Sequence, residues 1–117
     1  MQVIVTTIFF VELYEVNKDR KSKYRTLMKK IHRSLRQHAR DLPELLSYRT
    51  FEAGKSGVRT RFVEMFEFAD QDGSKRFFAR FSKTEWLRAL QQEFHKLVPR
   101  CPGFTWTEFL KDEWLVR

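Results

Sequence analysis

The sequence places two carboxylates inside a strongly apolar run, Phe-Val-Glu-Met-Phe-Glu-Phe, at residues 62–68. Because side chains alternate between the two faces of a strand, Glu64 shares a face with the phenylalanines and Glu67 lies on the other face. A buried carboxylate that lacks an ion pair has a raised pKa and can act as a general base. The alternative is an ion pair with an arginine on the same sheet. The candidate partners are Arg49, Arg59 and Arg61.

Four other side chains are candidates for lining a ligand pocket together with Glu64. They are His38, Tyr48, Trp86 and Trp106. His38 falls within the apolar arc of a predicted helix, where a polar residue either meets a partner on the sheet or faces a pocket. The aromatic residues are also compatible with an ordinary core, because pockets and cores in small domains are lined by the same residue types.

Histidine and cysteine spacing offers no metal site. The three histidines and the single cysteine, Cys101, include no pair at ligand spacing, and no Cys-x-x-Cys or His-Glu-x-x-His motif occurs. We expect no bound metal. Cys101 has no histidine near it in the sequence to activate it as a nucleophile.

Residues 54–56, Gly-Lys-Ser, match the end of a phosphate-binding loop, but they fall between two predicted strands and are predicted to form a hairpin turn.

All of the surplus positive charge lies within residues 18–41. That segment holds ten Lys and Arg against two Asp, and the rest of the chain is balanced, so the formal charge of +8 arises there. A basic face of this kind attracts phosphate groups or an anionic surface. The residues that would form it are Lys29, Lys30, Arg33, Arg36 and Arg40. Polyanion or nucleic-acid binding is therefore the alternative function, beside the plainer interpretation of a solvated helix face.

Hydrophobic periodicity predicts the elements that position these side chains. Strands are predicted at residues 2–16, 45–53, 58–69 and 104–116. Helices are predicted at residues 18–41, 74–81 and 82–98, with Pro43 and Pro99 ending the two longer ones. Asp70 to Gly73 is predicted as a turn. The motif Ser82-Lys83-Thr84-Glu85 is a capping box, which predicts that the last helix starts at Ser82.

The order β-α-β-β-α-β is that of a ferredoxin-like α+β fold. It predicts a four-stranded antiparallel sheet with the helices on one face, in a single domain that spans residues 1–117. The first strand is apolar on both faces from Val3 to Val11, and the helices cover only one of them. We therefore expect a homodimer that packs sheet to sheet across a two-fold axis. The basic face of residues 18–41 then points away from the dimer seam.

Three stretches of the chain carry a family resemblance. They are LPELLSYRTFEA at 42–53, RFVEMFEFADQDGSKRFFARFSKTEW at 61–86 and FTWTEF at 104–109. These stretches resemble the dimeric α+β barrel proteins, the group that includes the antibiotic-biosynthesis-monooxygenase-like domains. The resemblance implies a homodimer with a pocket between sheet and helices in each subunit. Members include cofactor-independent monooxygenases, haem-degrading enzymes and isomerases, so the resemblance does not choose a reaction.

The departures from the haem-degrading members argue against a bound cofactor. Those members resemble one another in an Asn on the first strand, where this chain has Thr6 and Thr7. Many members of the wider group carry a His at the kink position that Trp86 occupies. We therefore expect a cofactor-independent protein that binds a small molecule, with a monooxygenase-like activity as its enzymatic form. Whether the chain is an enzyme is left open by these residues.

The N-terminal residues and the cysteine content bear on location. Residues 2–16 lack a basic leading segment and a small-residue cleavage site, and Glu12 interrupts them, so they are predicted as a strand and not as a signal peptide. No apolar run approaches the roughly 20 residues that a membrane helix needs, so no membrane partner is expected. A single cysteine excludes an intrachain disulfide and fits a reducing compartment, which predicts a cytoplasmic location.

Overall fold

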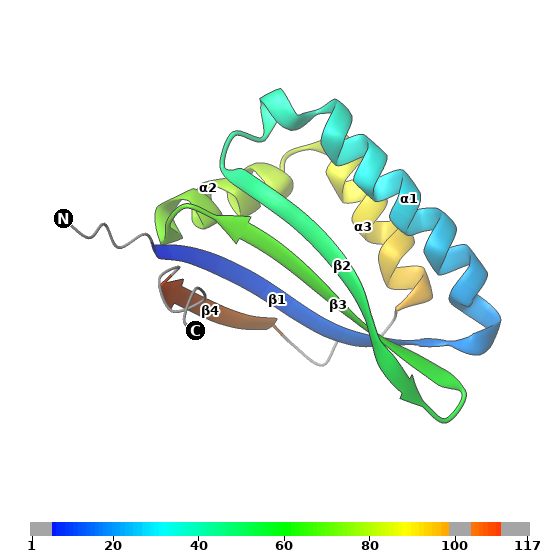
Figure 1. Ribbon diagram of the computed structural model, residues 1–117. Helices are drawn as coiled ribbons and strands as arrows, with labels where there is room; N and C mark the ends of the chain where they lie inside the picture. Colours follow the sequence, from blue (N-terminus) through cyan, green and yellow to red (C-terminus); the bar gives the residue numbers. More distant parts are fainter. Residues whose placement is uncertain (1–5, 99–103, 111–117) are drawn as a thin grey trace.

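The computed structural model describes residues 6–98 and 104–110 (Figure 1). The strands are β1 Thr6–Asn17, β2 Leu45–Ser56, β3 Arg59–Phe68 and β4 Phe104–Leu110. The helices are α1 Lys21–Gln37, α2 Gln71–Phe81 and α3 Glu85–Leu97, with short 3-10 turns at Lys18–Arg20 and Ala39–Asp41. Within the described ranges, none of the helices combines the length and the apolar character needed to cross a lipid bilayer.

The sheet has the strand order β2-β3-β1-β4, and neighbouring strands are antiparallel. β1 and β3 lie side by side in a register that pairs Glu12 with Glu64. On the other side of β3, Tyr48 pairs with Phe66 and Thr50 pairs with Glu64. Residues that are directly opposed in an antiparallel ladder project from the same face of the sheet. The register therefore places Glu12, Glu64 and Thr50 in one row across three strands.

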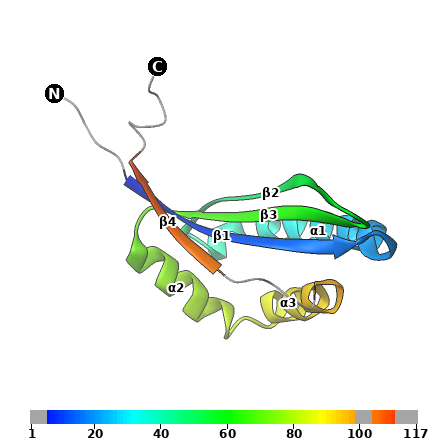
Figure 2. The ribbon, with the colours of Figure 1, turned by 90° about the horizontal axis from the view of Figure 1, so that it is seen from below.

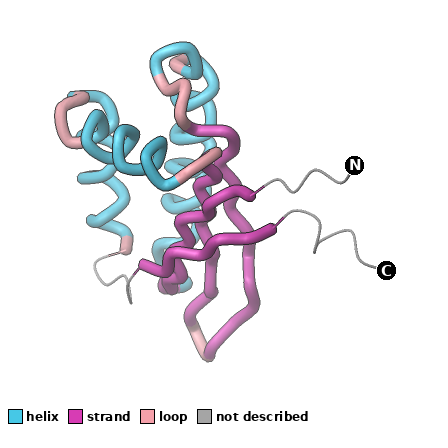
Figure 3. Tube along the Cα trace, turned by 90° about the vertical axis from the view of Figure 1, so that its left-hand side faces the viewer, coloured by secondary structure: helices cyan, strands magenta, loops and turns pink. Residues whose placement is uncertain are grey.

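The helices lie together on one side of the sheet, as Figure 3 shows. Figure 2 shows α2 and α3 end to end beneath the strands. β3 explains this packing, because its side chains alternate between buried and less buried positions along most of its length. One core cluster joins Tyr14 of β1 and Tyr24 of α1 to α3, and their two hydroxyl groups form a buried hydrogen bond. A second cluster centres on Phe68 of β3 and Phe77 of α2.

The opposite face of the sheet carries an apolar patch and is not covered by a helix in the described part of the chain. Leu13 and Phe51 point to this face, and each remains 46% exposed. Val63 lies between them on β3, Met65 follows two residues along the same face, and both are only half-buried. A contiguous apolar patch of this kind is typical of a protein–protein contact.

The first helix is shorter than residues 18–41. α1 covers Lys21–Gln37 and is flanked on each side by a 3-10 turn. His38 leaves the helical region, with φ −105° and ψ 20°. Leu42, just before Pro43, has ψ 57°, as expected for a residue that a following proline excludes from the α-helical region. His38 therefore lies at the end of the helix and not on its apolar arc.

The predicted capping box is wrong. α3 begins at Glu85 with Thr84 as its N-cap, and no side chain caps it. The Ser82 hydroxyl instead donates to the Ala79 carbonyl at 2.9 Å, which ties Ser82 to the end of α2. The segment Asp70 to Gly73, predicted as a turn, is the capped first turn of α2, because the Asp70 carboxylate accepts the Gly73 N–H at 2.6 Å.

The β2–β3 hairpin is longer than predicted. Strand pairing continues until Ser56 pairs with Arg59, so the reversal falls at Gly57 and Val58 and not over residues 54–57. Gly57 has φ 64°, a left-handed conformation that glycine adopts without the steric penalty of other residues. The hairpin therefore extends beyond the helices, as Figure 1 shows.

Candidate functional site

A cavity of about 380 Å³ lies between the sheet and the helices. Six phenylalanine and tyrosine side chains line it, and they are Phe10, Tyr48, Phe66, Phe78, Phe81 and Phe94. Aliphatic surface comes from Ile31 and Leu35 of α1 and from Leu87 and Leu90 of α3. Ligand sites in proteins have volumes of about 300–1,000 Å³, so this cavity has room for a small organic molecule.

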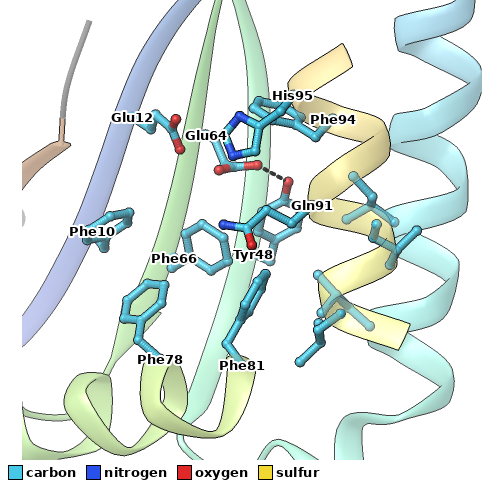
Figure 4. A pocket seen from close by; sticks show the side chains of 14 residues that line it. Phe10, Glu12, Tyr48, Glu64, Phe66, Phe78, Phe81, Gln91, Phe94 and His95 are labelled. Carbon is cyan, nitrogen blue, oxygen red and sulfur yellow. Dashed lines mark hydrogen bonds between the residues drawn. The ribbon is translucent and has the colours of Figure 1, made fainter. Parts of the chain in front are cut away.

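The polar groups of the cavity gather on one side of it (Figure 4). Glu12 and Glu64 reach it from β1 and β3, and they are only 5% and 7% exposed. The Tyr48 hydroxyl on β2 donates a hydrogen bond to Oε2 of Glu64. Gln91 and His95 of α3 complete this side and are exposed to solvent. None of the described residues that line the cavity is a lysine or an arginine.

The environment of Glu64 changes its acidity. Burial raises the pKa of Glu64 to about 8, the Tyr48 hydrogen bond opposes this change, and the Glu12 carboxylate adds to it by charge and hydrogen bonding. Burial, followed by the charge of Glu64, raises the pKa of the Tyr48 phenol well above its usual value. Tyr48 is therefore a hydrogen-bond donor at neutral pH. Glu64 titrates close to neutral pH and can hold or release a proton there.

An arginine partner for Glu64 is excluded in the described part of the chain. Because Arg59 and Arg61 occupy the other phase of β3, their side chains lie on the opposite face of the sheet. There they approach the Glu15 carboxylate at 3.6 Å. Glu67 shares that face and accepts a hydrogen bond from the Ser47 hydroxyl at 2.9 Å. Glu64 alone of the two carboxylates in residues 62–68 lines the cavity.

Two histidines, His32 and His95, lie at or beside the cavity. His32 Nε2 is 3.1 Å from the Thr50 hydroxyl, and its ring centroid is 4.8 Å from that of Tyr48. Burial, then the charge of Arg36, lowers the pKa of His32. His95 lines the mouth of the cavity one helical turn after Gln91. This spacing of polar residues at the edge of an apolar stripe is the signal that could have identified His95.

The structure does not bring His38 and Trp86 to the cavity. Their rings stack on each other outside it, with centroids 4.3 Å apart and an interplanar angle of 25°. His38 Nδ1 also lies 3.6 Å from the Asp41 carboxylate. On β4, Trp106 pairs with Phe10, and its side chain lies outside the described part of the structure. Of the sequence candidates, the described residues therefore unite Tyr48 and Glu64 only.

Glu12 is a member of the site that sequence reasoning missed. Its signal was that Glu12 is the first charged residue to interrupt the apolar run of the first strand. The register that sets Glu12 opposite Glu64 follows from the three-dimensional pairing of β1 with β3. Within residues 6–98 and 104–110, no three His, Cys, Asp or Glu side chains gather as metal ligands.

The basic candidates lie on the outward face of α1 and in the turn that follows it. Lys29, Arg33, Arg36 and Arg40 are exposed and make no ion pair within the described residues. Their spacings of four, three and four residues continue one stripe along the helical direction. Lys30 differs, because its ammonium group is 3.2 Å from the Glu93 carboxylate of α3.

Comparison with known proteins finds solved structures with the same architecture. No family model and no curated protein sequence matches the chain. A NIPSNAP family protein from Agrobacterium tumefaciens shares its fold at 13% identity and a TM-score of 0.62, covering 94% of this chain and 89% of that chain. A candidate antibiotic biosynthesis monooxygenase from Caulobacter crescentus has 10% identity, a TM-score of 0.63 and coverages of 90% and 89%. A dimeric ferredoxin-like protein from an uncultured marine organism has 16% identity, a TM-score of 0.59 and coverages of 90% and 94%.

These likenesses establish the class of the protein. The chain has an α+β ferredoxin-like fold, and the predicted fold class is confirmed at that level. The structural neighbours include the monooxygenase-like group that the sequence resembles. Because the identities lie far below the range in which a reaction is shared, the likeness extends to the fold and not to an activity.

Proposed function

We propose that the protein is a homodimer in which each subunit binds a small organic molecule in the cavity beside Tyr48 and Glu64. The observation that carries this proposal is a cavity of about 380 Å³ whose aromatic wall holds a buried, hydrogen-bonded carboxyl group. A large apolar pocket with a few convergent polar groups and a perturbed acid is the usual form of a binding site.

The enzymatic form of this proposal is a monooxygenase-like reaction that begins with proton removal. Glu64 is the general base of that step, because it is a buried carboxyl group in the cavity wall and burial raises its pKa to about 8. Tyr48 positions the carboxylate, because its hydroxyl group donates a hydrogen bond to Oε2. A neighbour of the same fold is described as a candidate antibiotic biosynthesis monooxygenase, which supports this choice of reaction class.

The uncovered face of the sheet supports the homodimer. Leu13 and Phe51 expose apolar surface there, and burying such surface contributes about 25 cal/mol for each Å². Solved neighbours are described as dimeric ferredoxin-like proteins. A second copy of the chain, turned by a two-fold axis, covers the apolar patches of both subunits at once. The four-stranded sheets then face each other, and the cavity lies on the far side of each sheet.

The binding proposal is tested by blocking the mouth of the cavity. Gln91 lines the cavity and is exposed, so Gln91→Trp places a large ring at the mouth without disturbing the core. Gln92 is its exposed neighbour outside the lining, and Gln92→Trp is the matched control. We expect Gln91→Trp to weaken the binding of an aromatic probe such as naphthylmethanol by about tenfold or more, a loss of about 1.4 kcal/mol. Equal affinity of the two variants, measured by calorimetry, argues against this cavity as the site.

A second candidate function rests on the basic stripe of α1. Arg33 and Arg36 are exposed without an acidic partner in the described residues, and such an array attracts polyanions. Fluorescence anisotropy with a labelled oligonucleotide at low salt tests it. The double variant Arg33→Glu and Arg36→Glu should lose affinity, and the control with Lys75→Glu and Lys83→Glu should keep most of it. Absence of binding by the wild-type protein at low salt refutes this second function.

A cytoplasmic location stays a prediction from the single cysteine of the sequence. Fractionation of the producing cells is the measurement that decides it.

A further inference from the structure

The ionisable groups of the cavity have an unusual charge balance. They are Glu12, Tyr48, Glu64 and His95, and the described lining includes no lysine or arginine. Glu12 and Glu64 are paired across β1 and β3, and more than nine-tenths of each residue is buried. Neither carboxylate makes an ion pair within the described residues. Two carboxyl groups are thus held side by side in an apolar site without a fixed positive charge beside them.

The aromatic wall of the cavity, like the two carboxyl groups, favours a positively charged ligand. Phenylalanine and tyrosine rings carry negative charge on their faces and attract cations within about 6 Å of the ring centre. The rings of Phe66, Phe78 and Phe81 line the cavity, and Figure 4 shows Phe66 next to Glu64, with Phe78 and Phe81 farther from the carboxyl groups. An anionic ligand meets two carboxyl groups and the negative faces of the rings. A cation meets a hydrogen-bond acceptor and an attractive aromatic wall.

We propose that the ligand of this cavity is a hydrophobic organic cation, a protonated amine on an aromatic or aliphatic body. This proposal rests on the binding function proposed above and names the chemical class that the site selects. The ammonium group donates hydrogen bonds to the Glu64 and Glu12 carboxylates. The hydrocarbon body packs against the phenylalanine rings. A carboxylate or phosphate ligand of the same size is excluded by the charge of the site.

Binding of a cation also moves a proton. Burial keeps Glu64 largely protonated near neutral pH, and a bound ammonium group favours its ionised form. The proton therefore leaves as the cation enters, and Glu64 binds the cation as a carboxylate. The ionisable groups that bear on Glu64 are Glu12 and Tyr14 from β1, Tyr48 from β2, Tyr24 from α1 and His95 from α3.

Three probes of equal size separate the charge of the ligand from its shape. They are naphthylmethylamine, naphthylmethanol and naphthoate, each titrated into the intact protein by calorimetry at neutral pH. A hydrogen bond to a charged group corresponds to about 10- to 100-fold in affinity, so the amine should bind that much more tightly than the alcohol. Naphthoate should bind most weakly. Equal affinities, or preference for naphthoate, overturn the cation proposal.

Two variants assign any preference to the carboxyl groups. The double variant Glu12→Gln and Glu64→Gln should abolish the preference for the amine over the alcohol, because the site then lacks negative charge. Glu67→Gln is the matched control, since Glu67 lies on the opposite face of β3 and should leave the preference unchanged. A preference that survives the double variant overturns the proposal.

The outcomes separate the two proposals. Binding of the amine and the alcohol with equal affinity, at a site blocked by Gln91→Trp, refutes the cation class and leaves the binding function in place. No binding of any probe refutes the binding function itself. A permanently charged probe, benzyltrimethylammonium, tests the proton release, because its own charge does not titrate. Its affinity should rise as the pH increases through about 8, and a flat profile refutes the coupled release of a proton from Glu64.

Discussion

Replacement of Glu64 by glutamine should flatten the dependence of the protein's stability on pH. The pKa of this carboxyl is raised from 4.5 to about 8 in the folded state, mainly by burial. Folding therefore favours the protonated form, and the stabilisation is fully present below about pH 4.5 and is lost as the pH rises through about 8. Each pH unit in this window corresponds to about 1.4 kcal/mol, so the loss over the whole window is on the order of 5 kcal/mol. Glutamine keeps the shape and the hydrogen bond to Tyr48 but does not titrate.

The assay is urea unfolding of the wild-type protein and of Glu64→Gln at several pH values between about 5 and about 8. The free energy of unfolding of the wild-type protein should fall relative to that of the variant by about 1.4 kcal/mol per pH unit. Glu67→Gln, on the opposite face of the same strand, should follow the wild-type profile. Parallel profiles for the wild-type protein and Glu64→Gln would show that burial does not raise the pKa of Glu64, and would refute the reasoning about the site.

Three further predictions concern the site, the core and the open face of the sheet. Tyr48→Phe removes the hydroxyl group that stabilises ionised Glu64, so the pKa of Glu64 should rise by about one to two units. An NMR titration of the carboxyl group measures this change, and an unchanged pKa contradicts the hydrogen bond. Tyr14→Phe should destabilise the protein by about 1–3 kcal/mol in denaturant unfolding, because the buried Tyr24 hydroxyl loses its partner. The double variant with Tyr24→Phe should lose less stability than the sum of the two single variants, and additive losses contradict the pairing. Leu13→Asp should give a monomer of 14.3 kDa in sedimentation, whereas the wild-type protein sediments as a dimer; a wild-type monomer contradicts the proposed use of this face.

Alternation along a strand was sufficient to predict the face on which Glu64 lies. In the structure, the phase of Phe62, Glu64, Phe66 and Phe68 is buried, and the phase of Val63, Met65 and Glu67 is half-buried. The same rule places Arg59 and Arg61 on the other face of the strand from Glu64, although both were offered as its candidate partners, so the predicted ion pair with either of them was wrong. The α+β class followed from the order of the elements for the same reason, since periodicities of 2 and 3.6 are local properties of the sequence.

The parts of the site that depend on tertiary pairing could not be predicted. Glu12 joins Glu64 because of the register between β1 and β3, which is set by the packing of both strands against the helices. His38 was placed on the apolar arc of a helix that the structure ends at Gln37, and the turn that follows carries it to Trp86. The capping box at Ser82 had the right residue types, but the preceding helix uses its hydroxyl group. Local motifs fail where two neighbouring elements compete for the same group.

The most direct test of the account is the position of a bound ligand. A crystal structure of the protein soaked with naphthylmethylamine should show the naphthyl ring against Phe66, Phe78 and Phe81, with its nitrogen within hydrogen-bonding distance of the Glu64 carboxylate. A cavity that stays without ligand at saturating concentration, or a ligand bound only elsewhere on the surface, would contradict the claim that the protein binds small molecules beside Glu64.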